Sequence, residues 1–473
     1  MKNVIRTVFT AFVFASVPIA NSAAQTSRTP IANKYRTTAR KMIAAAMSDS
    51  SAWNKLADLT DTFGHRQSGS AALDSAIDWI VARMKADGLE NVHTEPAMVP
   101  HWVRGAESAT LLKPRTLKLH MIGLGMTVGT SAGGITAPVI VVHSWNELTA
   151  HAPQVKGKIV LYDVPFTNYG ETVQYRGGGA VQAAKLGAVA VLIRSVSSGS
   201  MQNPHTGWMG YDSAVKKIPA AALSVEDAAM LSRMSARGQE VVVSLSMNEQ
   251  RLPDASSRNV IAELRGSELP DEVVVMGGHI DSWDVGQGAM DDGGGAVAAW
   301  EALRLMKRLG LRPRRTVRVV LWTNEETDGR GAEAYRDAHR NELNNHVMAM
   351  ESDNGVFRPL GYRIAGGRKA LAVARDIATL LGPLNATKVT AGGPEADVEK
   401  LASLGVPAMS LEVDGGKYFW YHHSEADTMD KLDPHEVAAC VALMSVMSYV
   451  IADMPSPLPR ADAVDSAAAL KKH

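Results

Sequence analysis

The feature that most constrains the fold is an alternation of short apolar runs with helical stretches, which begins near Asn259. Runs that are buried on both faces and separated by helices are typical of a mainly parallel sheet. We therefore expect an α/β domain over residues 248–454, with a mainly parallel or mixed sheet sandwiched by helices. The strands are expected at Val273–Met276, Val317–Trp322, Val347–Met350 and Ala408–Val413, and the helices at Gly294–Leu309, Gly331–Arg340 and Pro434–Asp453.

The length of 473 residues predicts two or three folded units. Between residues 129 and 247, short Val- and Ile-rich strands alternate with Gly-rich turns, and this segment has no cluster of His and carboxylate residues. We interpret it as a domain inserted into the catalytic one, and its Gly177–Gly179 run as a turn. Residues 25–128 are expected to form the N-terminal part of the catalytic domain, and residues 455–473 a flexible tail.

The first residues carry the pattern of a secretory signal. Lys2 and Arg6 precede an apolar stretch, and Ser22-Ala23-Ala24 offers small residues for cleavage, so residues 1–24 are predicted to be a signal peptide. This predicts a secreted or periplasmic protein. Lys plus Arg and Asp plus Glu both number 49, which gives no electrostatic reason to expect a nucleic-acid or membrane partner. Cys440 is the only cysteine, so an intrachain disulfide is impossible.

Acidic and imidazole side chains follow each of the four predicted strands of the second half. Ligands bind beyond the carboxyl ends of the strands in an open α/β sheet, so these groups should meet at one rim. Several carboxylates placed together repel one another, and a divalent metal compensates that charge. Imidazole with carboxylate suits zinc or a related ion. The groups are His279, Asp281, Asp291 and Asp292; Glu325 and Glu326; Glu351 and Asp353; and His422 and His423.

These motifs together resemble the co-catalytic dizinc exopeptidase family, and residues 129–247 are similar to the protease-associated domain that one secreted subgroup inserts. The matching segments are 279–284, 288–295, 324–326, 351–353 and 422–424. The resemblance implies two Zn²⁺ per chain, a homodimer, and hydrolysis of dipeptides or short peptides. It implies that His279 and Asp353 bind one zinc, that Glu326 and His423 bind the other, that Asp291 bridges both, that Glu325 is the general base and that Asp281 accepts a hydrogen bond from His279.

One position departs from the pattern of many relatives, which place a tyrosine immediately before the last ligand histidine. His422 stands there in this chain and could donate the same hydrogen bond to a developing oxyanion. Two rival functions share the implied fold: a glutaminyl cyclase-type acyltransferase with one zinc, and a binding protein without activity. The sequence leaves open whether the enzyme is a dipeptidase, a carboxypeptidase or an aminopeptidase.

Overall fold

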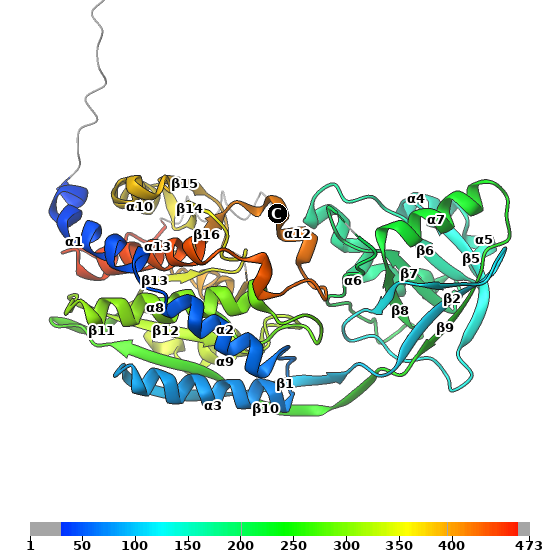
Figure 1. Ribbon diagram of the computed structural model, residues 1–473, viewed down its shortest axis with the longest axis horizontal. Coiled ribbons are helices and arrows are strands. Elements are labelled where there is room, and N and C mark those ends of the chain that lie inside the picture. Colours follow the sequence, from blue (N-terminus) through cyan, green and yellow to red (C-terminus); the bar gives the residue numbers. More distant parts are fainter. Residues whose placement is uncertain (1–29, 200, 395, 462–473) are drawn as a thin grey trace, which may run out of the picture.

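The computed structural model describes residues 30–199, 201–394 and 396–461. The predicted signal peptide, and residues 462–473 of the predicted tail, lie outside the described residues. The chain forms two lobes, each built around its own eight-stranded sheet, and two long strands run from one lobe into the other (Figure 1). These strands are β1 (Glu90–Val103) and β10 (Gln250–Leu264), which pair antiparallel from Glu90 opposite Glu263 to Val103 opposite Gln250.

The first sheet has the strand order β1-β10-β12-β11-β13-β16-β14-β15. Its four central strands, from β12 to β16, are mutually parallel, whereas β10 and β14 pair antiparallel with their central neighbours. The sheet is therefore mixed with a parallel centre, and the predicted fold class is confirmed. The further strands are β11 (Leu269–His279), β12 (Arg315–Trp322), β13 (His346–Glu351), β14 (Pro359–Ala365), β15 (Lys388–Ala391) and β16 (Ala408–Val413).

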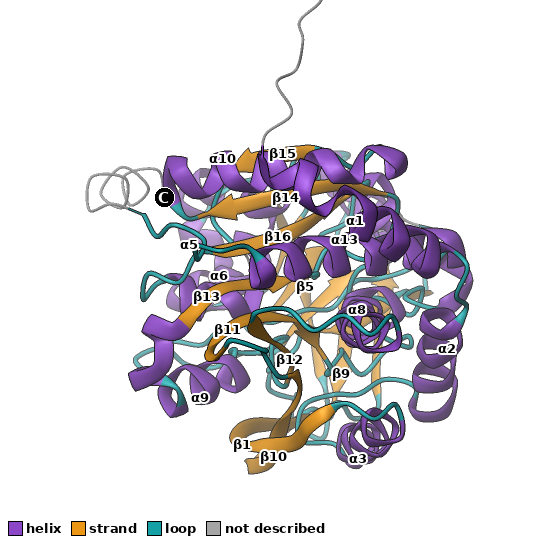
Figure 2. Cartoon of the chain, turned by 90° about the vertical axis from the view of Figure 1, so that its left-hand side faces the viewer, coloured by secondary structure: helices purple, strands orange, loops and turns teal. Residues whose placement is uncertain are grey.

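Successive side chains of the central strands point to opposite faces of the sheet, and both faces are buried. In β11, Val274 and Met276 belong to a large core on one face, while Val273 and Val275 belong to a smaller core on the other. Figure 2 shows the helices that cover the sheet. On the larger core lie α1 (Pro30–Met47), α2 (Ser51–Phe63), α3 (Ala71–Ala86), α8 (Gly294–Arg308), α10 (Gly367–Ala378) and α13 (Pro434–Asp453), and on the smaller core α9 (Arg330–Ala338) and α11 (Glu399–Ala402).

Helix α13 is the central core helix of this lobe. Asp433 caps it by accepting hydrogen bonds from the backbone N–H groups of His435 and Glu436, and Pro434 occupies its first turn. In the part of the chain that the structure describes, α13 alone is long and apolar enough to cross a membrane, but 89% of its apolar window is buried inside the molecule. Its hydropathy therefore matches its place in the core.

The second sheet has the order β3-β2-β9-β5-β6-β7-β8-β4 and starts earlier in the chain than the expected insertion at residue 129. β2 pairs with β9, and β4 pairs with β8, so residues 107–123 belong to this lobe and not to the catalytic one. The strands in residues 107–123 are short and partly exposed, so the sequence does not show which sheet they join. The elements are β2 (Glu107–Lys113), β3 (Leu117–Leu119), β4 (Met121–Gly123), β5 (Ile135–Val142), β6 (Ile159–Tyr162), β7 (Ala190–Arg194), β8 (Ala220–Leu223), β9 (Val242–Met247), α4 (Trp145–Ala150), α5 (Ala152–Val155), α6 (Tyr169–Lys185) and α7 (Val225–Ala236).

The Gly177–Gly179 run is helical, so the turn expected there is wrong. It lies inside α6, which faces β6 at this point. A Cβ added at Gly179 would lie 2.9 Å from the ring of Tyr162, and the Tyr162 hydroxyl donates a hydrogen bond to the Gly179 carbonyl. Close approach of helix and strand therefore explains a glycine where helix propensity alone disfavours one.

Candidate active site

The parallel strands deliver the candidate residues to one edge of the first sheet, as expected. β11 ends at His279, Glu325 and Glu326 follow the end of β12, and Asp353 follows the end of β13. After β16 the chain forms the short helix α12 (Tyr418–Tyr421), which leads to His422 and His423. Asp291 lies between β11 and α8 in a π-helical turn (Ala289–Gly293), where its own backbone is not helical.

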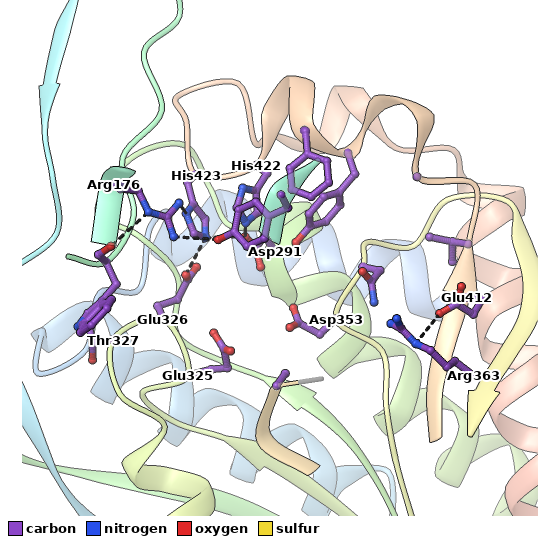
Figure 3. A pocket seen from close by; sticks show the side chains of 18 residues that line it. Arg176, Asp291, Glu325, Glu326, Thr327, Asp353, Arg363, Glu412, His422 and His423 are labelled. Carbon is purple, nitrogen blue, oxygen red and sulfur yellow. Dashed lines mark hydrogen bonds and ion pairs between the residues drawn. The ribbon is translucent and has the colours of Figure 1, made fainter. Parts of the chain in front are cut away.

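The Asp291 carboxylate lies at the centre of the cluster. Its Oδ1 is 3.4 Å from His279 Nε2, and its Oδ2 is 3.3 Å from His423 Nε2. On one side, His279 Nε2 also lies 3.3 Å from Asp353 Oδ1; on the other, His423 Nε2 lies 3.0 Å from Glu326 Oε2. The five side chains expected to bind metal therefore converge around a single carboxylate, and Figure 3 shows Asp291, Glu326, Asp353 and His423 turned toward one another.

The chemistry of these atoms fits a divalent metal. Among the described residues, three buried atoms of the cluster have no hydrogen-bond partner: His279 Nε2, Asp291 Oδ2 and Glu326 Oε1. Buried polar atoms without partners are rare in proteins, because no hydrogen bond offsets the free energy lost when they leave water. Three overlapping sets of residues offer ligand atoms that all lie within 4.8 Å of one another: His279, Asp291 and Glu326; Asp291, His422 and His423; and His279, Asp292 and Asp353.

Electrostatic effects in the cluster fit a site that binds a positive ion. Burial raises the pKa of Glu325 well above its usual range, and the Asp353 carboxylate adds to this effect. Burial likewise raises the pKa of Glu326, with the Asp291 carboxylate as the next cause. Burial also lowers the pKa of His423 to about 4. A neutral imidazole is the form that binds a metal ion.

Asp281 has a different partner from the one expected. The Nδ1 atom of His279 lies 2.9 Å from the backbone carbonyl of Asp281, and the Asp281 carboxylate is 3.8 Å from it. That carboxylate instead accepts hydrogen bonds from the Glu325 backbone N–H and the Ser68 hydroxyl, both at 3.2 Å. The peptide group of Asp281 therefore orients His279, while its side chain fixes the loop that carries Glu325.

Other buried polar side chains bond the backbone of the segments that carry His279 and Asp291. The Asp427 carboxylate accepts the backbone N–H groups of Met290 and Asp291 at 2.7 and 3.2 Å, and Asp292 accepts that of His279 at 3.1 Å. Arg66, which is fully buried, donates to the carbonyls of Ile280, Gln287 and Gly288 at 2.7 to 2.8 Å. The sequence did not single out Arg66, because its carbonyl partners leave no trace in the residue pattern.

The two neighbouring histidines differ in their contacts. Their rings stack with centroids 3.5 Å apart, and His422 Nε2 lies 3.6 Å from Asp291 Oδ2. Only His423 also lies near Glu326. The geometry thus places His423 between two candidate ligands and His422 beside the cluster.

Comparisons with known proteins agree with this arrangement. Residues 259–448 match peptidase family M28, and residues 131–231 match the PA domain. Carboxypeptidase Q of Xenopus laevis is 49% identical over 431 residues, which cover 90% of this chain and 92% of that protein. Human carboxypeptidase Q is 50% identical over 408 residues, which cover 86% of each chain. The chain belongs to peptidase family M28.

Solved structures extend the likeness to the whole fold. The crystal structure of a peptidase M28 precursor from Shewanella amazonensis SB2B is 35% identical, with a TM-score of 0.88 over 91% of this chain and 99% of that one. A zinc aminopeptidase from Bacillus subtilis is 19% identical, with a TM-score of 0.64 over 88% and 96%, and shares the fold. The predicted exopeptidase family is confirmed, with carboxypeptidase Q among the similar proteins, and this M28 chain is a metallo-exopeptidase.

The cavity of this M28 peptidase has a volume of about 690 Å³, and both lobes line it (Figure 3). The catalytic lobe contributes the cluster and, farther along the wall, an ion pair of 3.2 Å between Arg363 and Glu412. The PA lobe contributes Tyr169, Arg176 and Trp208. The sequence did not single out these three residues, because they are scattered in a segment that has no cluster of His and carboxylate residues.

Proposed function

We propose that this M28 peptidase is a two-zinc exopeptidase that hydrolyses dipeptides or short peptides. The observation that carries the proposal is the position of Asp291: each of its two carboxylate oxygens faces a different histidine, His279 at 3.4 Å and His423 at 3.3 Å. A carboxylate shared in this way suits a ligand that bridges two ions. His279 and Asp353 would hold one zinc, and Glu326 and His423 the other.

Two adjacent zinc ions supply an activated water and polarise the scissile carbonyl. The protein's own part is proton transfer by Glu325, whose side chain is 26% exposed and lines the cavity. Its carboxylate lies 3.9 Å from His279 Nε2, beside the ligands but farther from the imidazole than Asp291 or Asp353. This position supports a role for Glu325 in taking a proton from the attacking water and passing it to the leaving amine.

His422 and the cavity complete the proposal. His422 is only 6% exposed, lines the cavity and could donate a hydrogen bond to the carbonyl oxygen as negative charge develops. The cavity is walled by both lobes, which supports a short substrate. Export by the predicted signal peptide, and a homodimer, remain part of the proposal; light scattering at twice the 50.5 kDa mass of the chain would support the dimer.

The variant Glu325→Gln tests the proposal. It keeps the size of the side chain but removes the base, so we expect two zinc ions per chain and a fall in kcat on a dipeptide of roughly 10²–10⁴-fold. Glu333→Gln on the exposed face of α9 is the matched control and should behave as the wild type. Metal content and amino-acid release are measured on the same samples. A Glu325→Gln protein with most of its activity would refute the role of the base, and ammonia release from an N-terminal glutamine peptide would favour the cyclase.

A further inference from the structure

A segment of the PA lobe is hydrogen-bonded to the loop that carries His422 and His423. The Nδ1 atom of His205 lies 2.6 Å from the His422 carbonyl oxygen, and the Thr206 backbone N–H donates to the His423 carbonyl at 2.8 Å. Just beside them, the Asn203 amide donates to the Ser424 hydroxyl at 2.7 Å. Two residues in succession on one lobe therefore hold two successive carbonyls on the other.

These two carbonyls lie on either side of a residue in an unfavourable backbone conformation. His423 has φ of 59°, in the left-handed region that costs free energy for a residue with a Cβ. Such a conformation persists only where the surroundings fix it. The His422 and His423 carbonyls are the groups that turn when φ and ψ of His423 change, so the contacts from the PA lobe act directly on this conformation.

His205 is suited to a fixed structural contact. It is 1% exposed, its backbone N–H donates to the Ser195 hydroxyl oxygen at 2.9 Å, and its Nε2 has no partner among the described residues. Since a carbonyl can only accept, Nδ1 must carry the ring proton. The bond to His422 is thus the only hydrogen bond that this imidazole makes in the described part of the chain.

We propose that His205 is a positioning residue for the metal site: its imidazole, together with the Thr206 N–H, holds His423 in the conformation that turns its Nε2 toward Asp291 and Glu326. This inference rests on the proposed function only in taking His423 as a metal ligand. The inference means that the PA lobe positions a residue of the catalytic centre in addition to lining the cavity.

The test compares two replacements of His205. His205→Asn places an amide N–H close to the position of Nδ1 and should retain the bond, whereas His205→Leu has a similar size but no donor. His346→Leu is the control: His346 is fully buried, and its ring bonds a backbone carbonyl, that of Glu342 at 3.0 Å, and the Tyr335 hydroxyl at 2.9 Å, at the opposite end of the sheet from the metal cluster. Zinc binding is measured by titrating metal-free protein against a chelating indicator, and kcat and KM on a dipeptide are measured with zinc in excess.

We expect His205→Leu to bind one zinc as the wild type does and the second about 10- to 100-fold more weakly, the usual effect of removing a group that orients a metal ligand. Its kcat should fall more than its KM rises, and His205→Asn should recover most of both losses. Equal zinc affinities in the Leu variant and the wild type would overturn the inference, as would equal losses in the Leu and Asn variants. The zinc titration is independent of turnover, so an inactive wild type with this affinity pattern would refute only the proposed function.

Discussion

Gly207 follows the His205–Thr206 contact, and its replacement by alanine should disturb the metal site. Its φ of 129° is a conformation that alanine rarely adopts. A Cβ built there would lie 2.4 Å from Arg176 Nη1 and 2.6 Å from His423 Nδ1, whereas ordinary contacts begin at 3.4 Å. Arg176 is 5% exposed and bonded to the Thr206 and Trp208 carbonyls, the Tyr169 hydroxyl and, at 3.3 Å, His423 Nδ1, so it has little room to move away.

The His423 ring or the 206–208 backbone must therefore shift by about 0.8 to 1 Å to relieve these contacts, and a misplacement of about 1 Å at a reacting centre can cost roughly 10²-fold in rate. We expect Gly207→Ala to lower kcat on a dipeptide by about that factor and to weaken binding of one zinc. The overpacking should also cost about 1–3 kcal/mol of stability.

Gly178→Ala is the matched control, because a Cβ at Gly178 in α6 meets nothing within 4 Å. It should keep wild-type activity and gain up to about 1 kcal/mol from helix propensity. Thermal unfolding, zinc content and dipeptide hydrolysis are measured for both variants. Wild-type kcat and zinc affinity in a folded Gly207→Ala protein would show that the close approach of the two lobes does not position His423.

Two more predictions concern buried carboxylates. Asp281→Asn removes a carboxylate oxygen that accepts the Glu325 backbone N–H, so kcat should fall about 10- to 100-fold with a smaller change in KM. Equal changes in kcat and KM in a steady-state assay would contradict the role of Asp281 in positioning Glu325. Burial, together with Glu107 nearby, raises the pKa of Glu249 from 4.5 to about 8. Its contribution to stability is therefore full below about pH 4.5 and is lost as the pH rises through 8. Glu249→Gln should be more stable than the wild type by about 2 kcal/mol at pH 9 and show no such gain at pH 4.5. A difference in the free energy of unfolding that stays constant between pH 4.5 and pH 9 would refute this.

Much of the catalytic lobe could be predicted from the sequence, because its strands are apolar on both faces. Ala408–Val413 and Pro434–Asp453 have the predicted bounds, and the four predicted central strands all lie in the parallel part of the sheet. The long β1 and β10 were missed. The first half of β10 connects the lobes and carries exposed residues, and β1 is an edge strand that is only partly buried over residues 90–95, so neither shows the continuous pattern of a buried strand.

The candidate site was predictable for the same reason that the sheet was. A parallel strand with acidic residues at its carboxyl end brings those residues to a known edge, so His279, Glu326 and Asp353 could be grouped without coordinates. The carboxylate of Asp281 was given the wrong hydrogen-bond partner, because residue type and spacing do not tell whether a side chain or its peptide group faces the ring. Contacts with backbone carbonyls, such as those of Arg66 and His205, escape sequence reasoning altogether.

The two halves of the cluster are supported in different ways, and this bears on how the enzyme depends on its second lobe. His279 is the last residue of a buried strand, so the sheet itself fixes its position. His423 follows the four-residue helix α12 and has a left-handed backbone, so no regular element fixes it. The hydrogen bonds from His205 and Thr206 to the backbone, together with the contact of 3.3 Å between Arg176 Nη1 and His423 Nδ1, supply what the sheet does not. If the proposed zinc sites are right, a change in the position of the PA lobe should therefore affect the ion assigned to Glu326 and His423 before it affects the ion assigned to His279 and Asp353.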